Sequence, residues 1–230
     1  MLNISNARKS FGDIKILDGV NLLTENHGIL GLAGPSGGGK TTLLRCIQRL
    51  ETLDSGFIEY EGKSGFMFQD FQLFPHMTVL QNLLYAPSLK SKSKDLERRA
   101  GAMLGALGLE SKKNEYPSAL SGGQKQRAAL ARTLMTDPDF LLCDEPTSGL
   151  DVATTDDVVQ LLKSINRPET CKDSLRCLRT GVTMVIASHD LDFLTKISDR
   201  IVLLKNGKIE ADINPTDFDD PIGCLKGHYL

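Results

Sequence analysis

The sequence predicts an α/β fold in which helices cover a mostly parallel β-sheet. Apolar runs typical of buried strands alternate with segments of helical periodicity in the outer parts of the chain, and this alternation indicates βαβ units. A glycine-rich turn separates the apolar run 28–33 from a helical pattern that starts at Lys40. The chain has 230 residues, of which 40% are hydrophobic and 24% are charged. That composition suffices for one large globular domain with its own core.

The N-terminal part favours antiparallel strands. Most of the first thirty residues have a strand pattern, and the segment 14–23 alternates apolar and polar residues. Two short strand patterns follow at 57–60 and 65–68, with a turn between them. We expect these two segments to form one hairpin, so that the fold begins with a small antiparallel β part.

The middle of the chain, roughly 70–137, lacks clear strand patterns and is helical instead. The segment 78–109 has helical periodicity with a polar break at 90–94, and 124–135 predicts another helix. We therefore expect a single domain, 1–230, with a helical subdomain of about 70–137 inserted within it.

The last third of the chain returns to alternating strands and helices. Asn206 and Gly207 separate two short strand patterns, and this dipeptide is a strong hairpin signal. The segments 167–181 and 215–230 have no clear periodicity, so we expect them to be irregular. The expected strands are 140–143, 182–187, 201–204 and 208–211, with a helix at 153–165.

Charge and hydropathy exclude several classes of protein. The formal net charge is −2, so the chain has no global basic surface for nucleic acid, and we expect no nucleic-acid partner. No segment approaches the ~20 apolar residues that span a bilayer, and the N-terminus lacks the pattern of a signal peptide. We therefore expect a cytoplasmic protein whose membrane role, if any, depends on a partner.

The cysteines do not predict a disulfide framework. The chain has five of them, an odd number, scattered over its whole length. Cys171 and Cys177 share one polar segment, but their spacing is wider than that of a usual zinc pair and no second pair of ligands is near. We expect free, reduced thiols.

The glycine-rich turn has the complete pattern G-x-x-x-x-G-K-[ST] between a strand and a helix. Glycines allow backbone N–H groups to converge on phosphate oxygens, and the helix N-terminus adds a partial positive charge. Lys40 would place its charge at the outer phosphates, and Thr41 would ligate Mg²⁺. This pattern predicts a P-loop NTPase that binds the phosphates of a nucleotide. The predicted phosphate-binding residues are Gly34, Pro35, Ser36, Gly37, Gly38, Gly39, Lys40, Thr41 and Thr42.

Two adjacent acids end a later apolar strand, 140–143. The carboxyl ends of strands are where open α/β sheets bind their ligands. Asp144 would join Thr41 around Mg²⁺, and Glu145 would polarise the water that attacks the γ-phosphate. Together with the phosphate loop, these acids predict ATP hydrolysis rather than binding alone.

The segment 120–127 reads LSGGQKQR and leads into a helix. Ser121 is a good N-cap residue for that helix. The order of phosphate loop, LSGGQ and strand-Asp-Glu nevertheless resembles the ATP-binding-cassette (ABC) ATPases over nearly the whole chain. The resemblance implies a head-to-tail homodimer in which this helix N-terminus faces the γ-phosphate bound by the partner. The implied signature residues are Ser121, Gly122, Gly123 and Gln124.

Further residues match the family's pattern one by one. Phe11 stands where the family has an aromatic that stacks on adenine, although a core phenylalanine is the simpler alternative. Gln69 matches the glutamine that reaches Mg²⁺ and the attacking water. His189 follows a buried strand as the family's switch histidine does, which implies a donor to the γ-phosphate. Asp151, in the motif Ser-Gly-Leu-Asp, matches the residue that couples the two protomers.

Within the family, the segments 71–83 and 45–51 resemble the importers of polar amino acids such as glutamine. That resemblance implies an integral-membrane permease, a solute-binding protein, and a peripheral location at the cytoplasmic face of the cell membrane. Two departures set the chain apart from this subfamily: a short stretch between Lys40 and Gln69, and a long segment 167–181. An exporter, a lipoprotein-release or cell-division cassette, and a soluble non-transport ATPase remain as alternatives.

Overall fold

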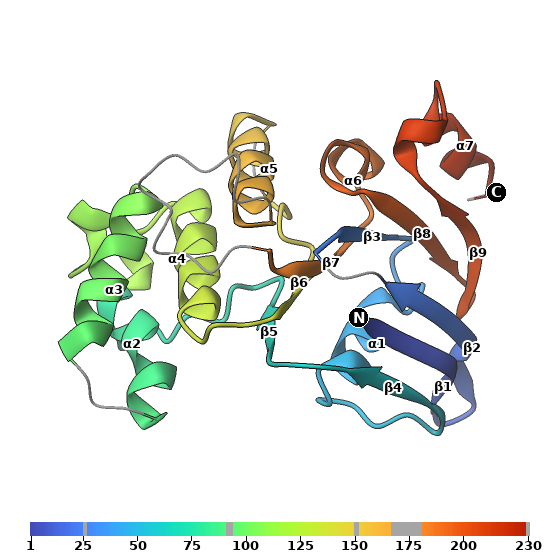
Figure 1. The fold of residues 1–230 in the computed structure, drawn as a ribbon, viewed down its shortest axis with the longest axis horizontal. Helices are drawn as coiled ribbons and strands as arrows, with labels where there is room; N and C mark the ends of the chain where they lie inside the picture. The colour runs from blue at the N-terminus through green and yellow to red at the C-terminus, as the bar shows by residue number, and fades with distance from the viewer. Residues whose placement is uncertain (25–26, 91–93, 150–151, 167–180, 229–230) are drawn as a thin grey trace. The chain divides into compact units, whose positions relative to one another are not determined.

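The structure is a computed structural model, and it describes residues 1–24, 27–90, 94–149, 152–166 and 181–228 (Figure 1). The chain divides into two compact units. The core unit comprises Met1–Phe66, Asp139–Pro146 and Val182–Leu230, and the helical unit comprises Met67–Pro138 and Thr147–Gly181. The predicted α/β fold is confirmed, whereas the expected inserted subdomain of about 70–137 remains a prediction.

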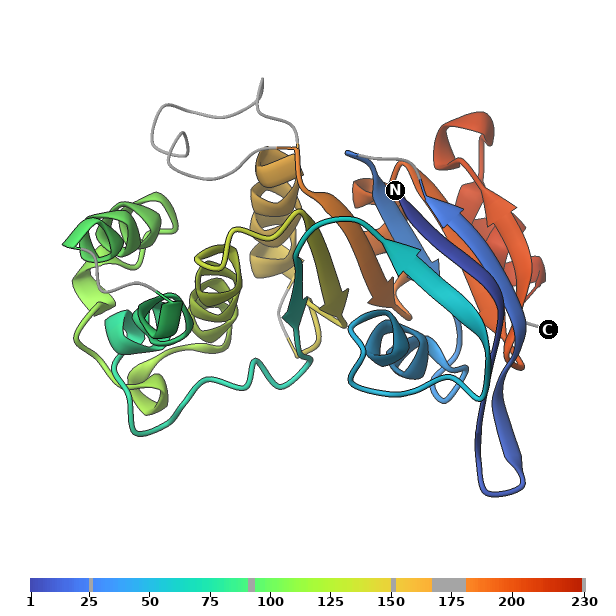
Figure 2. The same ribbon diagram turned by 60° about the horizontal axis from the view of Figure 1, so that its bottom comes forward.

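A three-stranded antiparallel sheet opens the core unit. Its order is β2-β1-β4, with β1 at Leu2–Phe11, β2 at Ile14–Thr24 and β4 at Ser55–Tyr60. Strands β1 and β2 form a long hairpin that ends beside Phe11 (Figure 2). In the middle strand, Leu2 pairs with Thr24 on one side and with Tyr60 on the other, so both neighbours have a fixed register.

The expected hairpin at 57–68 does not form. Strand β4 pairs with β1, whereas β5, Ser64–Met67, is an edge strand of the other sheet, next to β6. The burial of the two segments gives the reason: three of the four residues of β5 are buried, while no residue of β4 is. The backbone of Lys63 is held by Asp139, whose Oδ2 accepts from Lys63 N at 2.8 Å and whose N–H donates to Lys63 O at 2.8 Å.

A six-stranded sheet forms the centre of the core unit, in the order β5-β6-β7-β3-β8-β9. Strands β6, β7, β3 and β8 are parallel neighbours, and β9 closes the edge antiparallel to β8. Asn206 and Gly207 turn the β8–β9 hairpin with φ of 51° and 75°, as the sequence predicts. The strands are β3, Ile29–Ala33; β6, Phe140–Asp144; β7, Thr183–Ser188; β8, Arg200–Lys205; and β9, Lys208–Ile213.

The described residues of the core unit form three α-helices: α1, Lys40–Ile47; α6, Leu191–Ile197; and α7, Pro221–Gly227. The last one corrects the expectation of an irregular C-terminal segment. Asp220 caps α7 by accepting a hydrogen bond from Gly223 N, Pro221 occupies the first turn, and Leu225 is buried. An Asp-Pro start is a recognised helix signal, but a helix of seven residues is too short to show periodicity.

The helical unit contains α2, Val79–Lys90; α3, Lys94–Ala106; α4, Gly122–Leu134; and α5, Val152–Asn166. Asn82, fully buried on α2, fixes the chain before this helix. Its Nδ2 donates to the carbonyl groups of Phe74, Met77 and Thr78, and its Oδ1 accepts from Phe74 N. The predicted helical character of the middle of the chain is thus confirmed.

Three of the cysteines lie in the described part of the chain, and all three are free thiols, as expected. Burial raises the pKa of Cys46 to about 11 and that of Cys143 to about 12, so both remain protonated. Cys171 and Cys177 lie outside the described residues. No helix within the described ranges is long and apolar enough to cross a membrane.

Candidate functional site

The phosphate loop connects β3 to α1 in the core unit. A side chain at Gly34 (φ 154°) would place its Cβ 2.2 Å from Leu204 O, and one at Gly39 (φ 98°) would place it 2.9 Å from Ile16 O. Both positions therefore require glycine on steric grounds. The loop between them, Pro35 to Gly38, can approach an anion closely because it carries little side-chain bulk.

Lys40 is the first residue of α1, and its side chain lies against this loop. Its Nζ donates to Gly34 O at 2.8 Å and to Pro35 O at 3.1 Å, and it lies 3.7 Å from Glu145 Oε1. Burial lowers the pKa of Lys40, while the carboxylates of Glu145 and Asp144 act in the opposite direction. The ammonium group is thus held at the loop, next to the acids at the end of β6.

The N-terminus of α1 has no side-chain cap. Gly39 is the N-cap residue, in the left-handed conformation, and no side chain accepts a hydrogen bond there. The first N–H groups of a helix lack partners within the helix, so those at Lys40, Thr41 and Thr42 can donate to an anion. A phosphate group is the ligand that this arrangement favours.

Thr41 and Asp144 meet as the sequence predicts. Thr41 Oγ1 donates to Asp144 Oδ1 at 3.1 Å, and Asp144 is only 4% exposed. Burial raises the pKa of Asp144, while the hydrogen bond from Thr41 lowers it. Two adjacent hard oxygen ligands fit Mg²⁺, which uses one or two protein oxygens and completes its shell with water and phosphate. No group of three His, Cys, Asp or Glu side chains within the described ranges could hold a metal ion by itself.

Glu145 connects the loop to His189. Its Oε2 lies 2.9 Å from His189 Nδ1, and its Oε1 lies 3.7 Å from Lys40 Nζ. Glu145 is 9% exposed, whereas the side chain of His189 is 61% exposed. A carboxylate held beside an ammonium group and an imidazole at a sheet edge can orient and deprotonate a water. The structure therefore brings together five predicted residues of one site: Lys40, Thr41, Asp144, Glu145 and His189.

Two residues that contact predicted site residues are absent from the sequence-based prediction. Ser188, fully buried, donates to Glu145 Oε2 at 3.1 Å and accepts from Asp190 N. Lys9 Nζ lies 5.0 Å from the ring centroid of Phe11, which is 48% exposed at the end of β1. This cation–π contact holds the half-exposed ring in place. No local pattern in the sequence marks Ser188, because its partner Glu145 lies 43 positions away along the chain.

The remaining predicted residues belong to the helical unit. Gln69 is exposed and follows β5. Ser121 is the N-cap of α4, as predicted, and it forms a capping box: its Oγ accepts from Gln124 N, while Gln124 Oε1 accepts from Ser121 N. Gly122 and Gly123 form the first turn of α4. Asp151 lies outside the described residues.

Known proteins are similar to this chain in sequence and in fold. The chain is 37% identical to the arginine transport ATP-binding protein ArtM of Bacillus subtilis, over 95% of this chain and 93% of ArtM. The glutamine transport ATP-binding protein GlnQ of the same organism is 36% identical, over 95% of this chain and 92% of GlnQ. A dimeric post-hydrolysis structure of the ATP-binding cassette MJ0796 with ADP and Pi has a TM-score of 0.80 and 31% identity, covering 94% of this chain and 99% of MJ0796.

The matched sequence contains most of the site described above. Residues 17–148 fit the family described as ABC transporter, and this range includes the phosphate loop, the segment 120–127 and the acids at 144 and 145. His189 and Ser188 lie beyond it, but the relatives align over nearly the whole chain. The chain therefore belongs to the ABC transporter family, as an ATP-binding cassette that hydrolyses ATP.

Proposed function

We propose that this cassette powers a membrane importer for polar amino acids. The observation that carries the ATP-hydrolysing part of the proposal is the placement of Glu145 between Lys40 and His189, directly after Asp144. Such a site is built to cleave a phosphoanhydride and not only to hold a nucleotide. Two similar proteins that carry the names of arginine and glutamine transport support an amino acid as the transported molecule.

In the proposed reaction, each residue has a separate task. Lys40 and the N–H groups of the loop and of α1 bind the phosphates, and Phe11 stacks on the adenine ring. Thr41, Asp144 and Gln69 would hold Mg²⁺, and the ion would neutralise phosphate charge. Glu145 takes a proton from the attacking water, while His189 donates a hydrogen bond to the γ-phosphate.

The active form would be a homodimer with two shared ATP sites. The Ser121 hydroxyl and the N–H groups of Gly122 and Gly123 would contact the γ-phosphate bound by the partner, with Gln124 and Asp151 assisting. Ser121 Oγ accepts a hydrogen bond in the capping box, so its proton remains available for a phosphate oxygen. The dimeric MJ0796 structure with ADP and Pi supports this arrangement.

The permease would contact the helical unit at the segment 71–83. Arg132 on α4 fixes this segment by donating to Gln72 O at 2.5 Å and to Phe71 O at 2.9 Å. The same guanidinium lies 5.9 Å from the ring of Phe74, which packs edge-on against Tyr85. A fixed, partly apolar surface of this kind suits a protein partner. A permease and a solute-binding protein would place the cassette at the cytoplasmic face of the cell membrane.

Glu145→Gln tests the proposed hydrolysis. The variant should bind MgATP, accumulate as a dimer in size-exclusion chromatography with light scattering, and turn over at least a hundredfold more slowly than wild type. Glu210→Gln, a change at an exposed residue of β9, is the matched control and should behave as wild type. Near-normal turnover of Glu145→Gln would contradict the role of Glu145.

Transport itself requires a test in cells. Tagged protein should be purified from detergent-solubilised membranes, and its partners should be identified by mass spectrometry. We expect a multi-span membrane protein among them, together with loss of labelled amino acid uptake when Glu145→Gln replaces the wild type. Recovery of soluble partners alone would refute the importer.

A further inference from the structure

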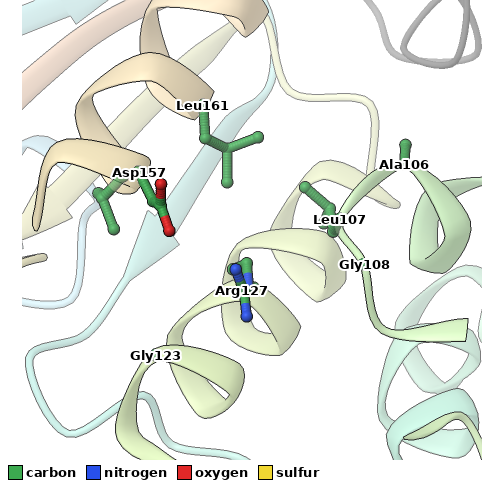
Figure 3. A pocket seen from close by; sticks show the side chains of 8 residues that line it. Ala106, Leu107, Gly108, Gly123, Arg127, Asp157 and Leu161 are labelled. Atoms are coloured by element: carbon green, nitrogen blue, oxygen red, sulfur yellow. The ribbon is translucent and has the colours of Figure 1, made fainter. Parts of the chain in front are cut away.

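A cavity in the helical unit lies outside the ATP site. Its volume is about 330 Å³, and residues of α4, of α5 and of the end of α3 line it (Figure 3). This volume is at the lower end of the ~300–1,000 Å³ that is typical of small-molecule sites. The cavity therefore suits a small metabolite better than a protein segment.

Two opposite charges face this cavity. Arg127 extends from α4, and the carboxylate of Asp157 points into the same space from α5 (Figure 3). The Arg127 Nε atom is buried and has no hydrogen-bond partner in the described part of the chain. This covered atom is closed to a ligand, but the Arg127 side chain lines the cavity, and a guanidinium group is suited to a bidentate contact with a carboxylate through its outer nitrogen atoms. Arg127 is thus positioned to bind an acidic group of a ligand.

The rest of the lining is apolar. Leu107 and Leu161 extend toward the cavity from opposite sides, and Val158, next to Asp157, is 4% exposed (Figure 3). A simple anion would leave both the Asp157 carboxylate and this apolar wall without a complementary group. A molecule with a carboxylate, an ammonium group and a short side chain complements all three.

The geometry points to a binding site for a free α-amino acid, with its carboxylate at Arg127, its ammonium group at Asp157 and its side chain against Leu107 and Leu161. Gly123 also lines the cavity, in the first turn of α4. An occupant would therefore lie beside the residues that we assign to the partner's γ-phosphate. If the chain powers amino acid import, as proposed above, the imported product would slow the ATPase through this site.

Calorimetric titration of the purified chain tests the binding. The probes are L-glutamine, L-glutamate and L-arginine, each compared with its N-acetyl and its C-terminal amide derivative. We expect at least one free amino acid to bind, and both of its derivatives to bind about 10- to 100-fold more weakly, because each lacks one charge-assisted contact. Absence of binding by all three amino acids, or equal binding of the derivatives, would overturn the proposal.

Three variants assign the site. Asp157→Asn should weaken amino acid binding about 10- to 100-fold, whereas Asp156→Asn, the same change at the neighbouring position of α5, should not. Arg127→Lys keeps the charge but loses the bidentate geometry, and it should weaken binding as well. Equal losses in the two aspartate variants, or displacement of the amino acid by inorganic phosphate alone, would contradict the site.

A further variant, Lys40→Ala, separates this proposal from the proposed hydrolysis. Lys40→Ala should lose affinity for a fluorescent ATP analogue yet bind the amino acid as wild type does. Asp157→Asn should show the reverse pattern, and its ATP turnover should no longer respond to the amino acid. Amino acid binding that disappears together with nucleotide binding in Lys40→Ala would place the amino acid at the ATP site and refute the cavity.

Discussion

Glu145 has a backbone conformation that costs free energy. Its φ of 48° lies in the left-handed region, which is unfavourable for a non-glycine residue by roughly 1–2 kcal/mol. Glu145 N–H donates to Ala187 O at 2.9 Å, and Ser188 donates to its side chain. These contacts from the end of β7 hold both the strained backbone and the carboxylate, so that the direction of the carboxylate is fixed before a nucleotide arrives.

Ser188→Ala tests this positioning role. The change removes the hydroxyl that orients Glu145, so we expect kcat for ATP hydrolysis to fall about tenfold, consistent with loss of one hydrogen bond to a charged group. The dissociation constant for ATP should change little. Thr183→Val, which removes another buried hydroxyl of β7, one that accepts from His27 N, is the control for stability. A drop in ATP affinity equal to the drop in kcat would argue against a role through Glu145.

Asp144→Asn should separate stability from activity. Burial raises the pKa of Asp144, which means that the folded core unit pays to keep this carboxylate ionised. Asparagine can still accept the hydrogen bond from Thr41 and carries no charge. We expect the unfolding free energy of nucleotide-free Asp144→Asn to be about 1 kcal/mol above that of wild type, which raises the melting temperature by ~2–4 °C. The variant should also lose Mg²⁺-dependent turnover. A lower melting temperature in differential scanning calorimetry would contradict this account.

At the N-terminus of helix α4, Ser121 has both a structural and a functional task. Ser121 caps the helix through the capping box, and we assign its hydroxyl proton to the partner's γ-phosphate. Aspartate is as good an N-cap as serine, but it has no proton to donate at neutral pH. The two tasks can therefore be separated by the choice of substitution.

Ser121→Ala and Ser121→Asp should differ in stability, and both should lose activity. The alanine variant should lose about 1 kcal/mol of unfolding free energy with the cap, while the aspartate variant should keep it. Both should lose ATP turnover in the dimer, and the aspartate variant should lose more because its charge repels phosphate. Urea denaturation and an ATPase assay measure the two quantities, and an active aspartate variant would refute the role in the partner's site.

The elements also show which features the sequence could predict. The phosphate loop and the cap of α4 are local, so spacing and residue type suffice to identify them. The placement of β4 and β5 in different sheets depends instead on residues far away along the chain: β4 pairs with β1, and Asp139 holds the backbone just before β5. Likewise, the bond from Ser188 to Glu145 joins residues 43 positions apart, and the cavity at Arg127 exists only because α5 packs near α4. Contacts of this kind have no signature in a single sequence.

For the whole molecule, nucleotide binding should appear as added thermal stability. A ligand at a hundredfold excess over its dissociation constant adds about 2.7 kcal/mol, which corresponds to roughly 5–11 °C for a chain of this size. Glu145→Gln prevents turnover during the scan, so MgATP should raise its melting temperature by that amount. The double variant that adds Lys40→Ala should show almost no shift, and an equal shift in both would place the nucleotide elsewhere.

The short link between β4 and β5 has a consequence for how the chain can vary. Only residues 61–63 separate the two strands, and the Asp139 contacts hold Lys63 at the end of the link. Adding or deleting one residue there would shift β5 by one position, and each of its buried side chains would move to the opposite face of the sheet. Gln69 would be displaced with it. The link therefore constrains chain length: natural variants with insertions or deletions should carry them elsewhere and keep the number of residues from Tyr60 to Gln69 constant.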